Sequence, residues 1–302
     1  SRFGGDLSRS TLAASVVRVG HAVQPLINLL RDRLLEADVI HGDETVVQVL
    51  KEAGRTAQAK SYLWAQTTDS GPPIRLFSYT PGRGTSHAQA LYEGIKPGAV
   101  LMSDGYEVYN GLAAAHGVIH LGCWAHARRK FYDIHAVQPT PITTYVLAQI
   151  GELYNIEAGI RGSPPERRRE VRLQFSKPIV EALHRWFNEQ FSSLSRKSVT
   201  AEAIGYAMNQ WQALVRYLDD GRIEIDNNAA ERALRTVALG RKNYLFLGSD
   251  AGGERAATMY SLLGTVKLNG MNPETYLRHV LSVIADYPVN RVDDLLPWNV
   301  SL

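Results

Sequence analysis

Hydrophobic positions along the chain change their spacing several times, and each spacing predicts a different kind of element. Between Asp38 and Leu50 the sequence is rich in β-branched residues, which is typical of a strand. Two further strand-like runs, residues 60–67 and 73–79, follow after short turn-prone segments. This alternation of runs and turns predicts an antiparallel meander of three strands.

Residues 86–123 alternate between helical and strand-like patterns. Residues 86–95 and 106–116 have helical spacing, and residues 99–103 and 118–123 are short apolar runs typical of buried strands. The predicted order is therefore strand, strand, strand, helix, strand, helix, strand. This order predicts an α/β fold.

Helical spacing dominates residues 138–220, where Val146, Ile150 and Leu153 share one helical face. We interpret this region as an all-helical insertion. The chain then divides into an N-terminal helical segment, the first part of an α/β core, the insertion, and the second part of the core with C-terminal helices. Their boundaries are residues 1–36, 37–137, 138–220 and 221–302.

The two ends of the chain are predicted to be helical as well. Ser8 or Ser10 is expected to cap the first helix, and Gly270-Met271-Asn272-Pro273 precedes a last helix from Glu274 to Ile284. Between them, the glycine-rich run from Leu247 to Gly253 predicts a hairpin or a loop.

Composition narrows the classes of protein that fit. The chain has 302 residues, 45% of them hydrophobic, which suits a globular protein with a real core. A net charge of +3 gives no polyanion-binding tail, although a basic face remains compatible with it. The single cysteine, Cys123, rules out an internal disulfide framework and fits a cytoplasmic setting. No signal peptide or membrane-spanning run is evident, and the first residue, Ser1, suggests a fragment.

Three acidic residues, each near the boundary of a different predicted element, are the leading candidates for chemistry. Asp43 and Asp104 follow apolar strand-like runs, and Glu231 lies at a predicted helix start. Carboxylates from such positions can converge on Mg²⁺, which prefers oxygen ligands. Two such ions can hold both the attacking and the leaving oxygen of a phosphoryl transfer. The pattern therefore predicts metal-dependent cutting or joining of nucleic acid.

The neighbours of these residues offer competing assignments. Side chains alternate along a strand, so Asp43 and Glu44 are expected to point to opposite faces, and only one of them can face the metal ions. Asp226 competes with Glu231, but its place before two Asn residues suits a helix cap better.

Longer motifs surround all three carboxylates. They are His41-Gly42-Asp43-Glu44-Thr45, Ser103-Asp104-Gly105-Tyr106, Cys123-Trp124-Ala125-His126-Ala127-Arg128-Arg129-Lys130-Phe131, Asp226-Asn227-Asn228-Ala229-Ala230-Glu231-Arg232 and Gly240-Arg241-Lys242-Asn243. These motifs resemble the catalytic part of insertion sequence 66 family transposases, and the resemblance runs from about Arg9 to Tyr287.

The resemblance implies a fold, an activity and partners. The fold would be ribonuclease H-like, a mixed sheet flanked by helices, with an all-helical insertion between the fifth strand and the helix that carries the catalytic Glu. The activity would be that of a DDE transposase, in which Asp43, Asp104 and Glu231 hold two Mg²⁺ or Mn²⁺ ions. The partners would be transposon ends and target DNA, further copies of the chain and accessory proteins of the same element, in the bacterial cytoplasm at the nucleoid. That family also has upstream zinc-binding and helical DNA-binding parts, which we do not find in this sequence.

Several basic residues near the carboxylates are candidate DNA contacts. A polyanion must lie beside such a site, and phosphate contacts position nucleic acid. The candidates are His126, Arg128, Arg129, Lys130, Arg235, Arg241 and Lys242. The competing interpretation of the arginines and lysines is a solvated helix face or a surface ion pair.

Cys123 and His126, with His120 nearby, also suggest zinc, since zinc commonly takes Cys and His ligands. The motif is incomplete because it has no second cysteine, so we favour a small buried residue at Cys123 and expect no zinc.

Two other functions use the same residues. A nuclease or junction resolvase would cleave branched or hybrid substrates without joining strands. A catalytically inactive DNA-binding remnant of a transposase would keep the fold without the chemistry.

Overall fold

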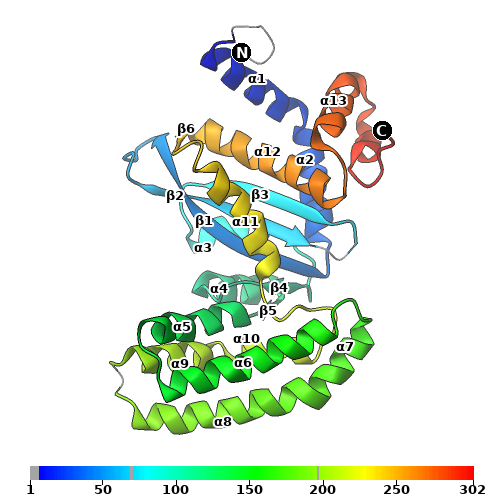
Figure 1. Ribbon diagram of the computed structural model, residues 1–302. Coiled ribbons are helices and arrows are strands. Elements are labelled where there is room, and N and C mark those ends of the chain that lie inside the picture. The colour runs from blue at the N-terminus through cyan, green and yellow to red at the C-terminus, as the bar shows by residue number, and fades with distance from the viewer. Residues whose placement is uncertain (1–6, 69–70, 196) are drawn as a thin grey trace. The chain divides into compact units, whose positions relative to one another are not determined.

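The computed structural model describes residues 7–68, 71–195 and 197–302 (Figure 1). Contacts between residues divide the chain into two units. Unit 1 comprises the chain up to Ala99, Ala114–Val118 and Ala229–Leu302, and unit 2 comprises Val100–Ala113 and Ile119–Asn228. We describe each unit separately.

The sheet of unit 1 is built on the predicted meander. Its strands are β1 (Val39–Lys51), β2 (Lys60–Thr68), β3 (Ile74–Thr80) and β6 (Leu247–Ser249). β1, β2 and β3 pair antiparallel in that order, and β6 pairs parallel with β1. Burial alternates along the β-branched part of β1, because Val47 and Val49 face the core while Val46 and Gln48, which alternate with them, are exposed.

Six helices belong wholly or largely to unit 1. They are α1 (Arg9–Ala22), α2 (Gln24–Leu35), α3 (Thr85–Leu91), α11 (Asn228–Gly240), α12 (Asp250–Leu268) and α13 (Pro273–Val283). Of the two predicted caps for α1, Ser8 holds the position, because its side chain accepts a hydrogen bond from the backbone of Thr11. Short 3₁₀ turns follow α13 at Ile284–Asp286 and Val289–Leu295.

Helix α12 covers the outer edge of β3 through side chains spaced four residues apart. Ser261 Oγ accepts the backbone N–H of Phe77 at 2.7 Å, and Thr265 Oγ1 accepts that of Arg75 at 3.0 Å. Each hydroxyl also donates to the carbonyl of the same strand residue. An edge strand with unpaired backbone groups invites aggregation, and these hydroxyls satisfy those groups within the molecule.

The loop or hairpin predicted from Leu247 to Gly253 is wrong over most of that run. After the short strand β6, helix α12 begins at Asp250, and Ser249 caps it by accepting the backbone N–H of Gly252. The glycine there reflects packing rather than a turn: a Cβ on Gly253 would lie 2.7 Å from the Tyr79 ring.

Unit 2 combines two short parallel strands with helices. The strands are β4 (Val100–Met102) and β5 (Ile119–Leu121), with Leu101 paired with His120. The helices are α4 (Glu107–His116, whose last turn falls in unit 1), α5 (Trp124–Val137), α6 (Pro141–Gly159), α7 (Pro165–Val171), α8 (Lys177–Ser193), α9 (Val199–Asn209) and α10 (Trp211–Val215). A π-helical turn, Arg172–Ser176, joins α7 to α8, and a 3₁₀ turn, Arg216–Leu218, follows α10.

A fully buried arginine anchors the helical part of unit 2. Arg172 makes two 2.7 Å hydrogen bonds to the carboxylate of Glu157 on α6. It also donates to the carbonyls of Tyr217, Asp220 and Ile223, in the segment that follows α10. A buried charge is tolerated only when it is paired and hydrogen-bonded, and Arg172 meets both conditions.

The fold class predicted from the sequence is confirmed. Antiparallel and parallel pairings occur together, and helices flank the strands, as in a ribonuclease H-like α/β fold. Residues 141–218 contain helices and no strand in the part that the structure describes. None of the helices in the described ranges combines the length and the apolar character needed to cross a bilayer.

Candidate active site

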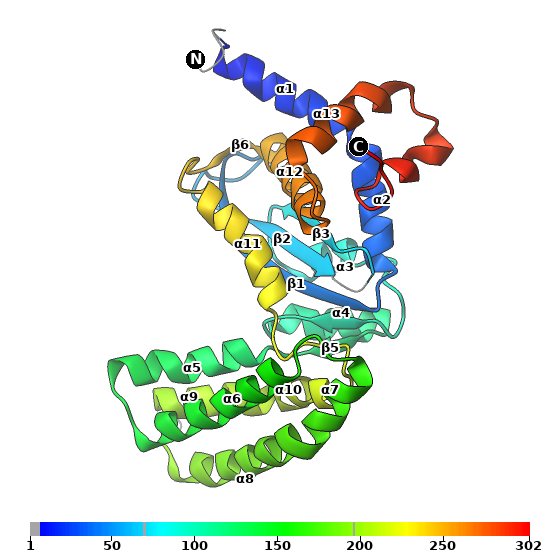
Figure 2. The ribbon, with the colours of Figure 1, turned by 45° about the vertical axis from the view of Figure 1, so that its right-hand side comes forward.

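Asp43 lies on β1, and the register of the sheet decides which way its side chain points. It is paired with Ala65 of β2, which is paired in turn with Phe77 of β3. Residues directly opposite each other in an antiparallel pair project to the same face. Ala65 and Phe77 are buried in the core cluster that also contains residues of α11 and α12. Asp43 therefore faces the side of the sheet over which α11 and α12 lie (Figure 2).

Glu44 points to the opposite face, as the alternation of side chains predicted. It is paired with Trp64, whose indole N–H donates to Thr80 Oγ1 at 2.7 Å. The Glu44 carboxylate is 5% exposed and lies 3.7 Å from the guanidinium of Arg83. Of the two neighbouring acids, only Asp43 is thus directed toward α11.

Glu231 lies in the first turn of α11 and is half-buried. The buried stripe of this helix includes Ala233, Leu234 and Val237. The stripe packs with Val47 and Val49 of β1, which project to the same face as Asp43. Because Glu231 is three residues before Leu234, it lies beside the buried stripe. Asp43 and Glu231 are therefore on the same side of the unit 1 sheet.

Asp104 belongs to unit 2 and lies in a turn just after β4. Its Oδ1 accepts the backbone N–H of Tyr106 at 3.0 Å, and its carbonyl accepts the hydroxyl of Tyr206, on α9, at 2.6 Å. The next residue, Gly105, has a φ of +86°, a conformation that strains other residues. A Cβ at Gly105 would also lie only 3.0 Å from the Gln210 side chain. The turn around Asp104 is thus fixed on both sides.

A chain of hydrogen bonds from Asn110 through His120 to Ser103 supports this turn. His120 Nδ1 lies 2.7 Å from Asn110 Oδ1, and His120 Nε2 lies 2.7 Å from Ser103 Oγ. An amide oxygen can only accept, so Nδ1 carries the proton and Nε2 accepts from the Ser103 hydroxyl. Burial, and then the nearby positive charge of Arg216, lower the pKa of His120 from 6.5 to about 4. The ring is therefore neutral near pH 7, which this chain of bonds requires.

The segment that enters α11 is held by side chains of unit 2. Asp226 is buried, and its Oδ2 accepts the hydroxyl of Tyr154, on α6, at 3.0 Å. Its Oδ1 accepts the backbone N–H of Asn228, the first residue of α11, so Asp226 satisfies a donor at the start of that helix from one residue before the cap position. The backbone N–H of Asn227 donates to Cys123 Sγ at 3.2 Å. Cys123 is buried, as expected of a small packing residue.

The residues predicted to contact DNA are divided between the two units. In unit 2, His126 is half-buried on α5, and the three cations after it are exposed. Arg128 lies 5.5 Å from the ring centre of Tyr132, Arg129 pairs with Asp133 at 3.9 Å, and Lys130 lies 5.3 Å from the ring centre of Tyr206. Since Tyr206 also bonds to the carbonyl of Asp104, Lys130 is the one of these whose contacts lead to a candidate carboxylate.

In unit 1, Arg235 and Lys242 are exposed, whereas Arg241 is half-buried. The guanidinium of Arg241 donates to the carbonyl of Val46 at 2.6 Å and to Thr45 Oγ1 at 3.3 Å. Arg241 therefore ties the end of α11 to β1, a structural role that the sequence did not suggest.

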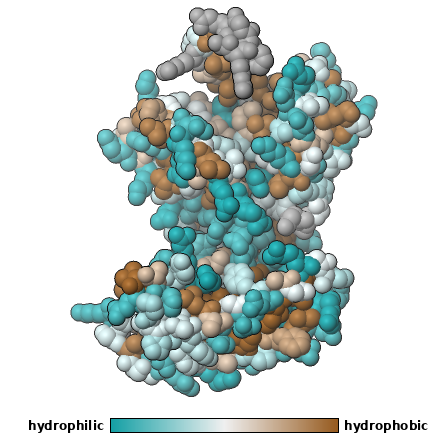
Figure 3. All heavy atoms as spheres, viewed as in Figure 1, coloured by the Kyte–Doolittle hydropathy of each residue, from teal (hydrophilic) through white to brown (hydrophobic). Residues whose placement is uncertain are grey.

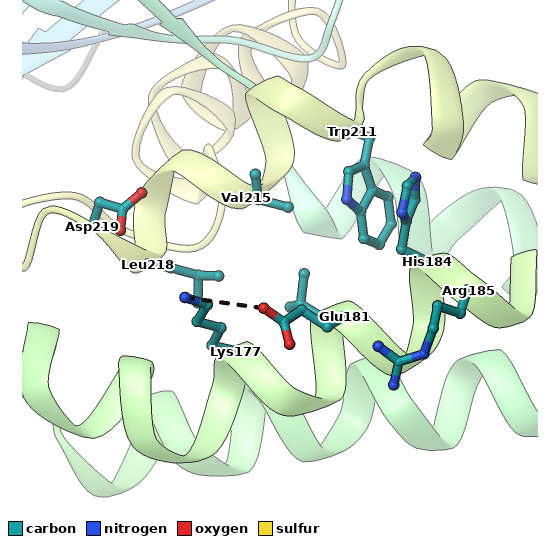
Figure 4. A pocket seen from close by; sticks show the side chains of 9 residues that line it. Lys177, Glu181, His184, Arg185, Trp211, Val215, Leu218 and Asp219 are labelled. Atoms are coloured by element: carbon teal, nitrogen blue, oxygen red, sulfur yellow. Dashed lines mark ion pairs between the residues drawn. The ribbon is translucent and has the colours of Figure 1, made fainter.

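A separate hollow of about 320 Å³ lies in unit 2 between α8 and α10 (Figure 4). Its charged residues pair locally, with Lys177 and Glu181 4.0 Å apart, and the His184 and Trp211 rings stack 4.7 Å apart. None of the predicted site residues is among the described residues that line it.

Comparison with known proteins gives the same result as the residues. A model of the transposase IS66 family matches residues 1–255, and a model of the IS66 C-terminal element matches residues 261–298. The chain belongs to the IS66 family of transposases.

Several proteins similar to this IS66-family chain carry names that assign no function. The uncharacterized proteins y4qI and y4hP of Sinorhizobium fredii are 37% and 35% identical to it, over 99% and 98% of the chain. The match covers only 57% and 56% of those two proteins, so the chain spans little more than half their length. The uncharacterized protein YuaK of Escherichia coli is 46% identical over 48 residues, which is 16% of the chain and 51% of that protein.

Sequence reasoning missed the residues that fix the Asp104 turn in this IS66-family chain. In the sequence, Ser103 stands within one of the family motifs, and His120 suggests only a zinc ligand. Asn110, Tyr206 and Gln210 belong to no motif. Only Ser103 and His120 carry a usable signal, because each is a polar residue in or directly after a short apolar run that predicts a buried strand.

Proposed function

We propose that this chain is the catalytic part of a DNA transposase that cleaves DNA strands and transfers them to a target with the help of two Mg²⁺ or Mn²⁺ ions. Membership of the IS66 transposase family supports the general role. In this proposal Asp43, Asp104 and Glu231 are the catalytic residues and the metal ligands.

One observation carries the proposal furthest. The sheet register turns Asp43, and not Glu44, toward the face over which the helix of Glu231 lies. Two carboxylates on one face of a sheet, 188 residues apart in sequence (231 − 43), supply oxygen ligands of the kind that Mg²⁺ prefers. Asp104 would add the third carboxylate, from a turn whose backbone is fixed by hydrogen bonds.

These residues fit divalent metal ions by their chemistry, since all three candidate ligands are carboxylates without sulfur or nitrogen. When bound, the ions would favour deprotonation of the attacking water and neutralise charge on the leaving 3′ oxygen. The chain itself supplies position and charge. The strand and helix backbones hold the carboxylates, and cations such as Lys130 contact phosphates beside the reacting group.

The reaction is a phosphoryl transfer with no covalent enzyme intermediate. In cleavage, an oxygen of water bonds to phosphorus and the bond from phosphorus to the 3′ oxygen breaks. In strand transfer, the freed 3′ hydroxyl replaces water as the attacking group. Its oxygen bonds to a phosphorus of target DNA and its proton passes to water, while the bond from that phosphorus to the target strand's own 3′ oxygen breaks and leaves a 3′ hydroxyl on the target. Charge stabilisation by preorganised groups accelerates both steps. The proposed partners are transposon ends, target DNA, further copies of the chain and accessory proteins of the same element.

The test is an assay with labelled transposon-end duplex, target plasmid and Mg²⁺. Joined products support the proposal. Nicks without joining would favour a nuclease or resolvase, and DNA binding without any product would favour an inactive remnant.

Ca²⁺ is expected to support binding but little chemistry, because it is larger and holds oxygen ligands less rigidly. Elemental analysis should find no tightly bound zinc, and one Zn²⁺ per chain that is lost in Cys123→Ser would overturn our interpretation of Cys123.

A further inference from the structure

Unit 1 contains a groove of about 890 Å³ that plays no part in the proposed chemistry. Helices α1 and α12 form its walls, and the segment from Tyr244 to Ser249 closes one end. Figure 3 shows hydrophobic side chains at the surface over α1 and near β6, with hydrophilic side chains beside them. A groove of this size is within the range of specific binding sites.

The apolar walls have helical spacing on both sides. α1 contributes Ala13, Val16 and Val17, which are three and four residues apart. α12 contributes a stripe of lining residues three and four apart, including Ala256, Met259 and Leu263. Two stripes of this kind with a space between them match the shape of a third helix, which packs with residues at the same spacing.

The apolar surface of the groove is open to solvent. Val16 and Phe246 are 45% and 46% exposed. A contiguous apolar patch on a protein surface, surrounded by polar residues, often marks a site where another protein binds.

The polar residues of the groove carry one sign of charge. Arg75, Arg255 and Lys267 line it, and no Asp or Glu is among the described residues that do so. Buried Nε of Arg75 and Nη1 of Arg255 have no hydrogen-bond partner within the described chain. Arg255 has one weak ion pair, at 3.5 Å, with the exposed Glu254. Burial lowers the pKa of Arg75, and the neighbouring charge of Arg232 lowers it further.

We propose that this groove binds an amphipathic α-helix of a partner protein, with aliphatic residues on one face and carboxylates beside them. The stripes select a helix, and the cations of the groove, which has no acidic residue among its described lining, select acidic residues. The α1 helix of a second copy fits poorly, because Arg9–Ala22 contains no Asp or Glu. Nucleic acid also fits poorly, because surfaces that bind it are more polar than these aliphatic walls.

The experiment uses the whole chain and a fluorescent synthetic peptide of about 16 residues, which is long enough for four helical turns. The peptide has Leu at helical spacing and Glu at the flanking positions, and a matched peptide has Lys in place of every Glu. We expect saturable one-to-one binding of the Glu peptide, at least about tenfold tighter than the Lys peptide.

Substitutions locate the binding. Val16→Glu and Phe246→Glu should each weaken binding of the Glu peptide by about tenfold or more, because they place a carboxylate among apolar contacts. Leu281→Glu on α13 is the matched control, since Leu281 is similarly exposed, at 37%, and does not line the groove. It should change binding less than about twofold. Circular dichroism checks that each variant is folded.

Several results would overturn the proposal. They are absence of saturable binding by the Glu peptide, equal binding of both peptides, or indifference to Val16→Glu and Phe246→Glu. Self-association of the chain that Val16→Glu abolishes would make a second copy the occupant instead. Displacement of the peptide by single-stranded DNA would make the groove a nucleic-acid site. If the groove binds a partner helix, DNA cleavage by the Phe246→Glu variant should stay normal, because Phe246 is not one of the proposed catalytic or DNA-binding residues. Failure of the groove proposal is therefore distinguishable from failure of the proposed transposase activity.

Discussion

The two units hold their candidate carboxylates by different physical means. In unit 1, Asp43 owes its direction to apolar neighbours, because the buried Ala65 and Phe77 fix the register of its strand. In unit 2, Asp104 owes its place to polar contacts, because hydrogen bonds from Tyr106 and Tyr206 hold the turn in which it lies. Hydrophobic register positions one candidate carboxylate and a hydrogen-bond network positions the other.

This difference predicts how each part will fail. Substitutions that disturb apolar packing lower the stability of the protein. A one-residue slip of a strand also turns every side chain of that strand to the other face. A hydrogen-bonded turn can lose its precise geometry while the rest of the unit stays folded. Substitutions near Asp43 should therefore lower stability first, whereas substitutions near Asp104 should lower function first.

The largest effect is expected when a carboxylate itself is removed. Asp43→Asn, Asp104→Asn and Glu231→Gln should each reduce DNA cleavage by about a thousandfold or more, because each removes an anionic oxygen from the site that we propose to hold two divalent cations. Cleavage rates in Mg²⁺ check this prediction. Glu44→Gln is the control, since its side chain faces the other side of the sheet, and it should keep substantial activity. If Glu44→Gln is as inactive as Asp43→Asn, our choice between the two neighbours is wrong.

The next largest effect is expected from acid. The pKa of His120 is lowered from 6.5 to about 4 in the folded chain, mainly by burial. The neutral ring therefore contributes its full stability above pH 6.5, and this contribution is lost as the pH falls from 6.5 toward 4. The loss amounts to at most about 3 kcal/mol. Urea unfolding across this pH range measures it. His120→Gln, which cannot be protonated there, should be less stable near pH 7 but should show a smaller decline; an identical decline in both proteins would remove His120 as its cause.

Packing behind Asp43 should affect stability alone. Val47→Ala removes two methyl groups from the core between β1 and α11 and should cost roughly 2 kcal/mol of unfolding free energy. The Mg²⁺ concentration that gives half-maximal cleavage should not change, because the register stays fixed by the remaining pairs. Val46→Ala, at an exposed position on the same strand, is the control and should cost little. A large rise in the Mg²⁺ requirement of Val47→Ala would break the contrast between the units.

Substitutions in the hydrogen-bond network of Ser103, His120 and Asn110 beside Asp104 should change the Mg²⁺ requirement of cleavage with little loss of stability. Asn110 is exposed, so Asn110→Ala should leave the chain folded while it frees the Nδ1–H of His120. We expect the Mg²⁺ concentration for half-maximal cleavage to rise by about tenfold, as is typical when an outer partner of a metal ligand is lost. Asn110→Asp keeps an acceptor oxygen and should restore most of the affinity. A defect that Asn110→Asp does not rescue would point to a different role for Asn110.

The smallest effect is expected on the salt dependence of DNA binding. Arg128→Ala and Arg129→Ala should weaken binding to all duplexes about equally and reduce the salt slope by about one unit per lost phosphate contact. The measurement is affinity for transposon-end and scrambled duplexes at several salt concentrations. Arg291→Ala serves as the control. Arg291 is exposed, pairs with Asp294, and is far in the sequence from Arg128 and Arg129. A strong preference for the end sequence that survives high salt would show that these residues include a sequence-reading surface.

The sequence predicted the elements well wherever spacing carried the signal. The meander and the helical insertion followed from the spacing of hydrophobic residues. Asp104 follows β4 and Glu231 lies in the first turn of α11, as predicted, whereas Asp43 lies inside β1 and not at the end of a strand. What it missed depends on contacts between distant segments. The edge of β3 is satisfied by Ser261 and Thr265, about 190 residues away, and no local pattern reveals such a pair. Gly253 predicts a turn from the sequence. In the structure it leaves room for the ring of Tyr79, which is also distant in the sequence.

The clamp on Asp226 bears on how this chain could be shortened. A protein engineer would look first at the helical insertion, which carries none of the three proposed catalytic carboxylates. Yet Tyr154, in the middle of α6, bonds to Asp226, only five residues before Glu231. Arg172 reaches the carbonyls of Tyr217 and Ile223 in the same returning segment. Deletions at the bend around Gly162 or between α8 and α9 avoid these anchors. A deletion that removes α6 or the π-helical turn would release the segment from which the helix of Glu231 starts.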